Sequence, residues 1–407
     1  MRDAPFRGDG LEFSEPVEKA FRVKPIVHRD GRRSYWIFSE FGELHRPAVN
    51  VLRRFNESTQ QTYAFGLVDH LNWLHANRLV VSTVKVEDLR RYMNALTGRG
   101  NGVFGVAWRD RPPVGASAGS NVATIVKAFY LESEETDPSV VQWLSGKLAT
   151  VRRGGRVVTA NPLSPKKRSG KPRFLSDEVV TALLEPGVLT SARDSMILRW
   201  LVDSGIRVGG LCGLRFTDLH LVRDHPCGQR RDPHVHIVGR DDNPNRARAK
   251  SYHEAGVSPD GHVIDGVIRA VSDSMIGTFY TYLLDEFHPI QHLVSHEQVL
   301  IHLKGPSAGD ALGTSGVRKM LRRACARAGL NSYVTPHAFR HNAAAQLMVA
   351  TDFNADLVAQ EFGWASAEQV TGLYGRAANR ESTKFLVQAW EATAPGRMPQ
   401  DTKEDPQ

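Results

Sequence analysis

The chain has 407 residues, of which 41% are hydrophobic and 24% are charged. This length suits two domains, and this composition excludes disordered, collagen-like and fibrous proteins. The net charge of +8 favours a polyanionic partner. No apolar run approaches the roughly 18 residues of a membrane span, and no signal peptide is evident, so we expect a cytoplasmic protein with no membrane partner.

Residues 1–49 contain strand-like pieces without a chemical signature, and we expect them to form an N-terminal arm of unknown role. From residue 50 to 150 the apolar residues recur at helical spacing in several segments. The first of these helices is predicted to begin at a capping box formed by Ser58 and Gln61. Residues 50–150 are therefore predicted to form a small helical bundle.

Residues 151–173 are rich in basic residues and contain no acidic one. Glycines and prolines lie among the cations, which predicts an extended basic linker between two domains. A solvated tether is the alternative. The basic residues, which we interpret as DNA-binding candidates, are Arg152, Arg153, Arg156, Lys166, Lys167, Arg168, Lys171 and Arg173.

Residues 174–394 are predicted to form a second, larger domain of helices around one β-hairpin. A helix over about 192–203 should end at Gly205, and further helices are expected from about 267 and over 315–328. Residues 234–238 and 253–258 flank a polar turn and are predicted to be the two strands of the hairpin. The polar tail, 395–407, is expected to be disordered.

The cysteines are Cys212, Cys227 and Cys325, with no C-x-x-C pair, which argues against disulfides and a cysteine-based zinc site. Two groups of histidines raise the question of a metal site. The first surrounds Cys227 in a loop-like region and Pro289 interrupts the second, so we interpret both as surface and hairpin histidines. No metal and no cofactor is predicted. The histidines are His220, His225, His234 and His236, and then His288, His292 and His296.

The segment VTPHAFRH contains the strongest local signal for chemistry. Thr335 suits an N-cap and Pro336 the first helical position, which places His337 and Arg340 on one face of the first turn. Free backbone N–H groups and a guanidinium at a helix start favour phosphate binding. A solvated or salt-bridged pair is the alternative.

Two further segments carry weaker signals. Arg207 follows Gly205 at a predicted helix end, and Gly363 ends another helix before Ser366 opens the one that leads to Tyr374. Taken singly, Arg207 would be structural and Tyr374 a core residue.

Taken together and in order, these segments resemble the catalytic domain of the tyrosine recombinase (phage integrase) family. The segment TYAFGLVDHLNWL before the linker resembles the start of that family's core-binding domain. The residues that match the family's catalytic positions are Arg207 in SGIRVGGLCGLRFTDL, Lys250 in RARAKSYHEAGVSP, His337 and Arg340 in HAFR, Trp364 in FGW and Tyr374 in TGLYGR.

The resemblance implies a mainly α, two-domain fold: a helical, SAM-like core-binding domain and an α-rich catalytic domain with a small β-hairpin or sheet. It implies a site-specific recombinase that cleaves and rejoins double-stranded DNA through a 3′-phosphotyrosyl intermediate, without ATP or metal. Such proteins act as a tetramer on two DNA sites, which here implies a nucleoid-associated protein. The C-terminal segment, 381–391, is expected to dock on a neighbouring protomer.

The resemblance also implies a role for each matched residue. Arg207 and Arg340 would clamp the phosphate, and Tyr374 would attack it. Lys250 would protonate the leaving 5′ oxygen. His337 would act as base and hydrogen-bond donor, and Trp364 would pack or donate through its indole.

The sequence departs from the family pattern in three places. Gly210 stands where many members carry a glutamate, Trp364 replaces the commoner histidine, and ten residues separate Trp364 from Tyr374, one more than usual. Arg246 and Arg248 lie near Lys250 and compete for its role. Two other functions stay open, a type IB topoisomerase and an inactive DNA-binding regulator with the same fold.

Overall fold

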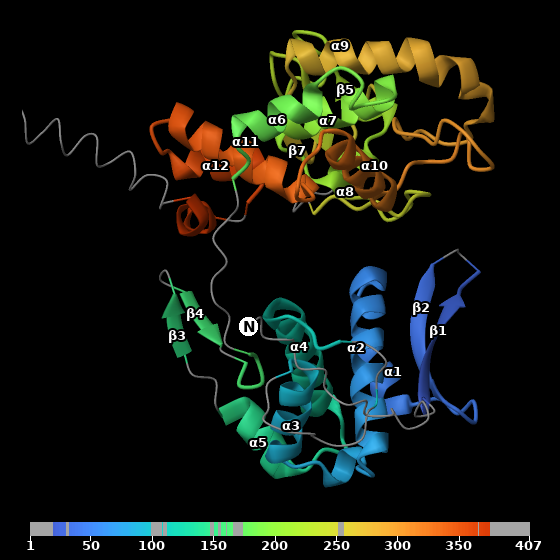
Figure 1. Cartoon of the computed structure of the whole chain (residues 1–407), viewed down its shortest axis with the longest axis vertical. Helices are drawn as coiled ribbons and strands as arrows, with labels where there is room; N and C mark the ends of the chain where they lie inside the picture. Colours follow the sequence, from blue (N-terminus) through green and yellow to red (C-terminus); the bar gives the residue numbers. More distant parts are fainter. Residues whose placement is uncertain are drawn as a thin grey trace, which may run out of the picture. The chain divides into compact units, whose positions relative to one another are not determined.

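The computed structural model describes residues 19–29, 32–98, 108, 112–146, 150–153, 156–159, 161–165, 174–250, 256–364 and 366–374. The chain divides into two compact units, Met1–Gly170 and Lys171–Gln407 (Figure 1). Both are mainly helical, as predicted, and the second carries a small antiparallel sheet, as predicted; the first unit also carries two antiparallel hairpins. Within these ranges, no helix combines the length and the apolar character that a membrane span requires.

The first unit joins a β-hairpin to a helical bundle. The hairpin pairs its two strands from Phe21↔Ser39 to Val27↔Arg33, so the strand-like pieces near the N-terminus are strands. Tyr35 and Ile37 of the hairpin are buried in the same core as the bundle. The elements are β1 (Phe21–Val27), β2 (Arg33–Ser39), α1 (Arg46–Leu52), α2 (Glu57–Ala76), η1 (Val81–Thr83), α3 (Val86–Leu96), α4 (Ala116–Glu132) and α5 (Pro138–Gly146).

Helix α2 begins earlier than the sequence suggested. Its N-cap is Asn56, whose side-chain oxygen accepts a hydrogen bond from the backbone N–H of Thr59 at 3.1 Å. The predicted capping box of Ser58 and Gln61 is therefore wrong. Asparagine is an equally strong N-cap, and Asn56, two residues upstream of Ser58, starts the helix earlier.

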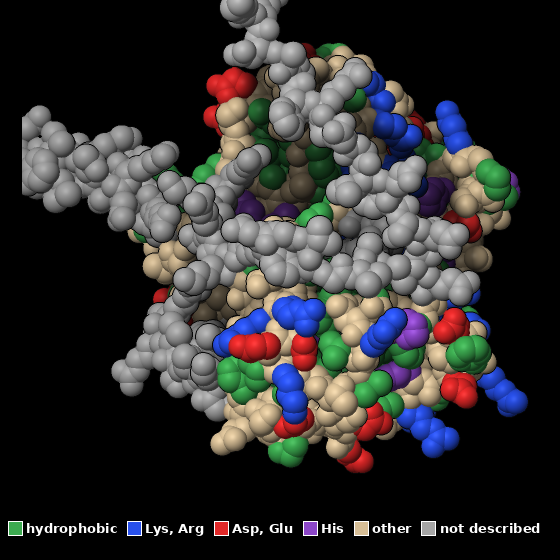
Figure 2. Space-filling model, turned by 60° about the horizontal axis from the view of Figure 1, so that its bottom comes forward, with side chains coloured by type: hydrophobic (Ala, Val, Ile, Leu, Met, Phe, Trp, Pro, Cys, Tyr) green, Lys and Arg blue, Asp and Glu red, His purple; other side chains and the backbone are tan. Residues whose placement is uncertain are grey.

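On helix α3 of the first unit, the surface arginines are paired with acidic residues of the same helix. Arg90 pairs with Glu87 at 3.1 Å, and Arg91 pairs with Asp88 at 3.2 Å. In the lower half of the face shown in Figure 2, Lys and Arg side chains are interspersed with Asp and Glu side chains. The helix therefore offers no surface of a single charge to a polyanion.

The predicted linker begins as a hairpin. Strands β3 (Thr150–Arg153) and β4 (Arg156–Thr159) pair antiparallel from Thr150↔Thr159 to Arg153↔Arg156. This part of the linker is extended, as predicted, but it is paired with itself. Lys166, Lys167, Arg168, Lys171 and Arg173 lie outside the described residues, so contact of the linker with DNA stays a prediction.

The second unit is built around α7, which is buried among neighbouring helices. The indole of Trp200 on α7 donates to the carbonyl oxygen of Met275 on α9 at 3.0 Å. The elements are α6 (Asp177–Leu184), α7 (Ala192–Ser204), α8 (Val208–Gly213), η2 (Phe216–Asp218), β5 (Leu219–His220), β6 (His234–Ile237), β7 (Val267–Ala270), α9 (Asp273–Tyr282), η3 (Leu283–Phe287), η4 (His288–Leu293), α10 (Thr314–Arg327), α11 (Pro336–Ala350) and α12 (Ala355–Phe362). Residues 367–374 form a further helical segment.

The sheet of this unit differs from the predicted hairpin. Strand β6 lies between β5 and β7, and it pairs with β7 from His234↔Ala270 to Ile237↔Val267. The prediction that residues 253–258 supply the second strand is wrong for residues 256–258, where Val257 makes only an isolated bridge to Val263; residues 251–255 lie outside the described chain.

The run Val-Ile-Arg-Ala-Val at 267–271 explains the difference. We expected a helix from about residue 267, but β-branched residues favour the sheet, and α9 begins only at Asp273 after the N-cap Ser272. The connection between β6 and β7 therefore spans residues 238–266 and includes Lys250.

A buried ion pair anchors this connection to the domain. Asp218 is fully buried, and its carboxylate accepts hydrogen bonds from Nη1 and Nη2 of Arg240 at 2.8 and 2.6 Å. It also accepts the backbone N–H of Arg215 at 2.9 Å. The first residues of the loop that carries Lys250 are thus held against the domain by the Arg240–Asp218 ion pair.

We expect Asp218→Asn to destabilise the protein by about 3 kcal/mol, because it leaves the largely buried guanidinium of Arg240 without its counter-charge. Asp242→Asn is the matched control. Asp242 pairs with Arg215 at 2.7 Å but is 72% exposed, so its loss should cost less than about 1 kcal/mol. Urea unfolding measures both, and equal costs would contradict the anchoring role.

Candidate active site

Arg340 is the buried centre of the candidate site. It lies in the first turns of α11, whose N-cap Thr335 accepts a hydrogen bond from the backbone N–H of Ala338, and Pro336 opens the helix as predicted. Arg340 is 3% exposed. Its guanidinium donates to the carbonyl oxygen of Gly205 at 3.1 Å and to that of Phe362.

The guanidinium of Arg340 is held by aromatic rings and carbonyl groups. It lies 5.0 Å from the ring centre of Phe362 and 4.7 Å from that of Trp364. Burial, with the neighbouring cations Arg207 and Arg269, lowers the pKa of Arg340 to about 8. Among the described residues no acceptor reaches its Nε. A bound anion would relieve this buried charge, so the arrangement favours an anion site.

Arg207 is placed beside Arg340 by the end of α7. Gly205 ends that helix with φ +58°, a left-handed conformation that favours glycine. A Cβ on Gly205 would lie 2.8 Å from the Cβ of Ala343 on α11, so glycine also allows the two helices to approach. Arg207 then caps α8, and its Nη1 donates to the carbonyl oxygen of Lys250 at 3.3 Å.

These cations line one pocket. Its wall includes Arg207, Lys250, Arg269 and Arg340, together with the ring of Phe362. The Lys250 side chain is exposed, whereas its backbone is tied to Arg207. A pocket with four cationic side chains in its wall suits a polyanionic substrate such as a phosphodiester.

Sequence reasoning missed Arg269, which lies on β7 and is 3% exposed. Its Nη1 donates to the carbonyl oxygen of Glu361 at 2.5 Å and lies 3.5 Å from the Glu361 carboxylate. The guanidinium also lies 4.0 Å from the ring centre of Phe362. Arg269 therefore holds the end of α12 against the sheet. In the sequence, only its position as a single cation in the apolar segment 267–271 could have indicated that it is buried.

Tyr374 is fully buried near Arg340. It packs with Ala343 and Met348 of α11 and with Phe362 of α12. Its hydroxyl forms a hydrogen bond of 2.7 Å with Nδ1 of His341. Burial raises the pKa of Tyr374 to about 12, although the nearby Arg340 acts in the opposite direction. The hydroxyl is thus protonated at neutral pH and shares a hydrogen bond with the imidazole.

His341 is a second residue that sequence reasoning left without a role. It lies one turn after His337, and the two ring centres are 4.2 Å apart. Burial, with His337 and Arg340, lowers the pKa of His341 to about 4, so its imidazole is neutral above that pH and can accept a proton. The predicted base, His337, is exposed, and the tyrosine hydroxyl contacts His341 instead. In the sequence, the second histidine of HAFRH was the one feature that could have indicated this role.

Comparisons with known proteins find similarity to recombinases over most of the chain. The model of the phage integrase family matches residues 277–381, which include His337, Arg340 and Tyr374. The chain is 24% identical to tyrosine recombinase XerC of Staphylococcus epidermidis, over 84% of this chain and 94% of that protein. The chain is thus similar to tyrosine recombinases of the phage integrase family. Transposase A from transposon Tn554 of Staphylococcus aureus is 26% identical, over 45% of this chain and 43% of that protein.

Solved recombinase structures share the fold. A structure of the Tn1549 transposon integrase in complex with transposon right end DNA matches with a TM-score of 0.51 and 13% identity, over 83% of this chain and 98% of that chain. The post-cleavage complex of XerH recombinase with a difH substrate matches with a TM-score of 0.50 and 15% identity, over 83% and 82%.

The structure accounts for two departures from the recombinase pattern. A Cβ on Gly210 would lie 2.8 Å from Cγ2 of Ile237, so this chain has no room there for a glutamate side chain without moving β6. Trp364 stacks on Phe362 with ring centres 5.1 Å apart and faces the Arg340 guanidinium. Its contacts support packing as its role.

Gly209 controls how closely the Lys250 loop approaches the domain. A Cβ at this position of α8 would overlap the backbone carbonyl oxygen of Arg248. We expect Gly209→Ala to push the loop outward and to slow DNA cleavage roughly tenfold or more through misplacement of Lys250. Gly277→Ala is the matched control, since nothing lies within 4 Å of its added Cβ. Single-turnover cleavage rates compare them, and equal rates would contradict the proposed packing constraint.

One prediction about the histidines is wrong. We interpreted the group around Cys227 as scattered through a loop, but His220 lies on β5, and His234 and His236 lie on β6. All three are buried, as is Cys227. Strand pairing, which the sequence did not reveal, gathers them. The other group, His288, His292 and His296, joins no such cluster among the described residues.

Proposed function

We propose that this chain is a site-specific DNA recombinase that cleaves and rejoins DNA strands through a 3′-phosphotyrosyl intermediate, with Tyr374 as the nucleophile. The observation that carries the proposal is the pairing of Arg340, a buried cation with no counter-carboxylate among its hydrogen-bond acceptors, with the buried hydroxyl of Tyr374. The first supplies an anion site and the second a nucleophile for the same phosphate.

Arg340 and Arg207 stabilise the negative charge that develops on the non-bridging oxygens during attack. Arg340 is fixed by two carbonyl oxygens and two rings before substrate binds, so little reorganisation is needed. Preorganised donors of this kind each lower a barrier by about 3 kcal/mol. Arginine also suits the task because its planar fork binds two phosphate oxygens together.

His341 and Arg340 prepare the nucleophile. With a pKa raised to about 12, Tyr374 must lose its proton as it attacks phosphorus. The neutral imidazole of His341 already shares a hydrogen bond with this hydroxyl and, in the tautomer with a free Nδ1, is the first proton acceptor; the nearby guanidinium of Arg340 stabilises the phenolate. His337 lies next to His341 and is proposed as a further hydrogen-bond donor.

Lys250 donates a proton to the departing 5′ oxygen. The new bond joins Tyr374 to the 3′ phosphate, and the bond to the 5′ oxygen breaks. Rejoining runs the same steps in reverse, with a 5′ hydroxyl as the attacking group. The covalent intermediate conserves the energy of the phosphodiester, so strand exchange needs no ATP.

DNA is the proposed partner, and the solved complexes of two recombinases of the same fold with DNA support it. We extend this to a homotetramer on two double-stranded sites, with residues 151–173 along the DNA backbone and the protein at the nucleoid. Segment 381–391, outside the described residues, is proposed to dock on a neighbouring protomer.

A recombinase is favoured over the two alternatives. The matched relatives include recombinases, a transposase and an integrase. An inactive regulator gives no physical reason for the poised Tyr374–His341 pair. A topoisomerase would relax supercoils but would not exchange strands between two sites.

Covalent capture tests the proposal. A pool of nicked duplexes of randomised sequence would be incubated with the protein, because a nick near the cleavage point traps the intermediate. We expect covalent protein–DNA adducts, whose sequenced DNA defines the site, and exchange between two copies of that site. Absence of any adduct would contradict the proposal, and adducts without exchange would favour the topoisomerase.

A further inference from the structure

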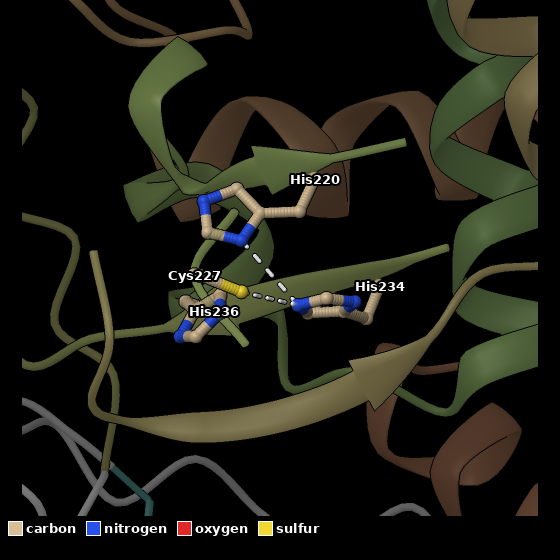
Figure 3. A group of neighbouring side chains, drawn as sticks. All are labelled: His220, Cys227, His234 and His236. Atoms are coloured by element: carbon tan, nitrogen blue, oxygen red, sulfur yellow. Dashed lines mark hydrogen bonds between the residues drawn. The ribbon is translucent and has the colours of Figure 1, made fainter. Parts of the chain in front are cut away.

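Four buried side chains lie together on one face of the three-stranded sheet of the second unit. His220 of β5 and His234 of β6 are register partners, and His236 follows on the same face of β6 because side chains alternate along a strand. Cys227 comes from the connection between the two strands. Nitrogen atoms of the three imidazoles and Sγ of Cys227 all lie within 4.8 Å of one another (Figure 3).

Backbone carbonyl groups fix which nitrogen of each imidazole carries hydrogen. Nε2 of His220 lies 3.3 Å from the oxygen of Thr217, Nδ1 of His234 lies 2.7 Å from that of Asp232, and Nδ1 of His236 lies 2.9 Å from that of Asp265. A carbonyl oxygen only accepts, and a neutral imidazole has one N–H. The remaining nitrogen of each ring therefore presents a lone pair to the cluster.

These lone pairs lack sufficient hydrogen-bond donors. Nδ1 of His220 and Nε2 of His234 lie 3.3 Å apart, with a lone pair on each. The Cys227 thiol lies 3.2 Å from Nε2 of His234 and carries a single proton. Among the described residues, no hydrogen-bond partner reaches the buried Nε2 of His236. A shared cation would satisfy all four atoms.

We propose that His220, Cys227, His234 and His236 bind one Zn²⁺ in a tetrahedral, structural site. With zinc–nitrogen bonds of about 2.0–2.1 Å, the corners of a tetrahedron lie about 3.4 Å apart, close to the 3.3 Å between the two imidazole nitrogens. Imidazoles that donate their second N–H to carbonyl groups are typical of zinc ligands. Four protein ligands leave no open position, which distinguishes a structural from a catalytic site.

The ion would join β5, β6 and the connection between them. Strand β6 ends at Ile237, which lines the pocket formed with Arg207 and Arg340, called here the phosphate pocket. The loop that carries Lys250 follows directly after this strand. Zinc thus stabilises the base of that loop and takes no part in the phosphate chemistry, for which the arginines supply the charge. This replaces the prediction that the chain holds no metal.

Metal content and cobalt spectroscopy test the site in the full chain, made without a histidine tag. Elemental analysis should find about one Zn²⁺ per chain, because such binding is coupled to folding. Replacement by Co²⁺ should give the intense visible bands of tetrahedral cobalt and a near-ultraviolet band from its bond to sulfur. Cys227→Ser should remove the sulfur band, whereas the control Cys325→Ser, which alters another buried cysteine, should keep it.

A measurement on the unmodified chain keeps the proposal falsifiable if a variant fails to fold. Prolonged chelation should lower the melting temperature, and Zn²⁺ should restore it. The proposal is overturned if protein prepared with added Zn²⁺ contains none in stoichiometric amount, if bound cobalt is octahedral, or if chelated and zinc-loaded proteins melt together.

Discussion

Tyr374→Phe is expected to abolish strand cleavage and adduct formation, a loss of at least roughly 10⁴-fold. The substitution removes one hydroxyl group, and with it the only atom that we assign to attack phosphorus. DNA affinity should stay within about threefold, because no proposed DNA contact is lost. Folding stability should fall by only about 1 kcal/mol, since the hydrogen bond to His341 is lost and the ring stays packed.

Tyr280→Phe controls for the loss of a phenol elsewhere. Tyr280 is 44% exposed on α9, so this variant should cleave at the unmodified rate. Cleavage would be followed on the nicked site recovered from the random pool, and affinity by gel shift on the same DNA. Adduct formation by the Tyr374→Phe protein would mean that another residue is the nucleophile.

Arg340→Lys is expected to slow cleavage by at least roughly 10³-fold, which corresponds to about 4 kcal/mol of transition-state stabilisation. A lysine ammonium cannot contact the carbonyl oxygens of Gly205 and Phe362, lie against the rings of Phe362 and Trp364 and bind two phosphate oxygens together. The loss should appear in the single-turnover rate with saturating DNA, because the missing contact strengthens in the transition state.

The matched control is Arg327→Lys on α10. Arg327 also donates to a backbone carbonyl group, that of Val188 at 2.6 Å, but it does not line the phosphate pocket. We expect its cleavage rate to change less than about threefold, with a stability cost of about 1 kcal/mol. If Arg340→Lys and Arg327→Lys cleave alike, the phosphate clamp is assigned to the wrong residue.

Features with a local physical cause were predictable from the sequence. The end of α7 at Gly205 and that of α12 at Gly363 follow from the left-handed conformation that glycine adopts readily, with φ values of +58° and +59°. The start of α11 follows from Thr335 and Pro336. These signals sufficed to place Arg207, Arg340 and Tyr374, and the family resemblance joined them into one site.

Features that depend on strand pairing were not predictable. The partner of β6 lies beyond a connection of residues 238–266, and local polarity suggested a nearer strand. The same pairing sets His220 opposite His234, so an error in the strands concealed the cluster around Cys227. Arg269 was missed for this reason too, because its inward position follows only once β7 is known.

Tertiary contacts decided the remaining differences. The choice of His341 over His337 as partner of the tyrosine hydroxyl depends on how the helical segment 367–374 packs on α11. Both histidines lie on one face of that helix, and sequence spacing cannot distinguish them. The burial of Arg340 likewise depends on contacts with Gly205 and Phe362, two residues that are far from each other in the sequence.

Mapping the attachment point of trapped DNA tests the central claim most directly. The covalent adduct would be digested with nuclease and protease, and the modified peptide would be sequenced by mass spectrometry. We predict a nucleotide remnant on the peptide that contains Thr371-Gly372-Leu373-Tyr374, joined through the oxygen of Tyr374. A remnant on any other residue would contradict the account.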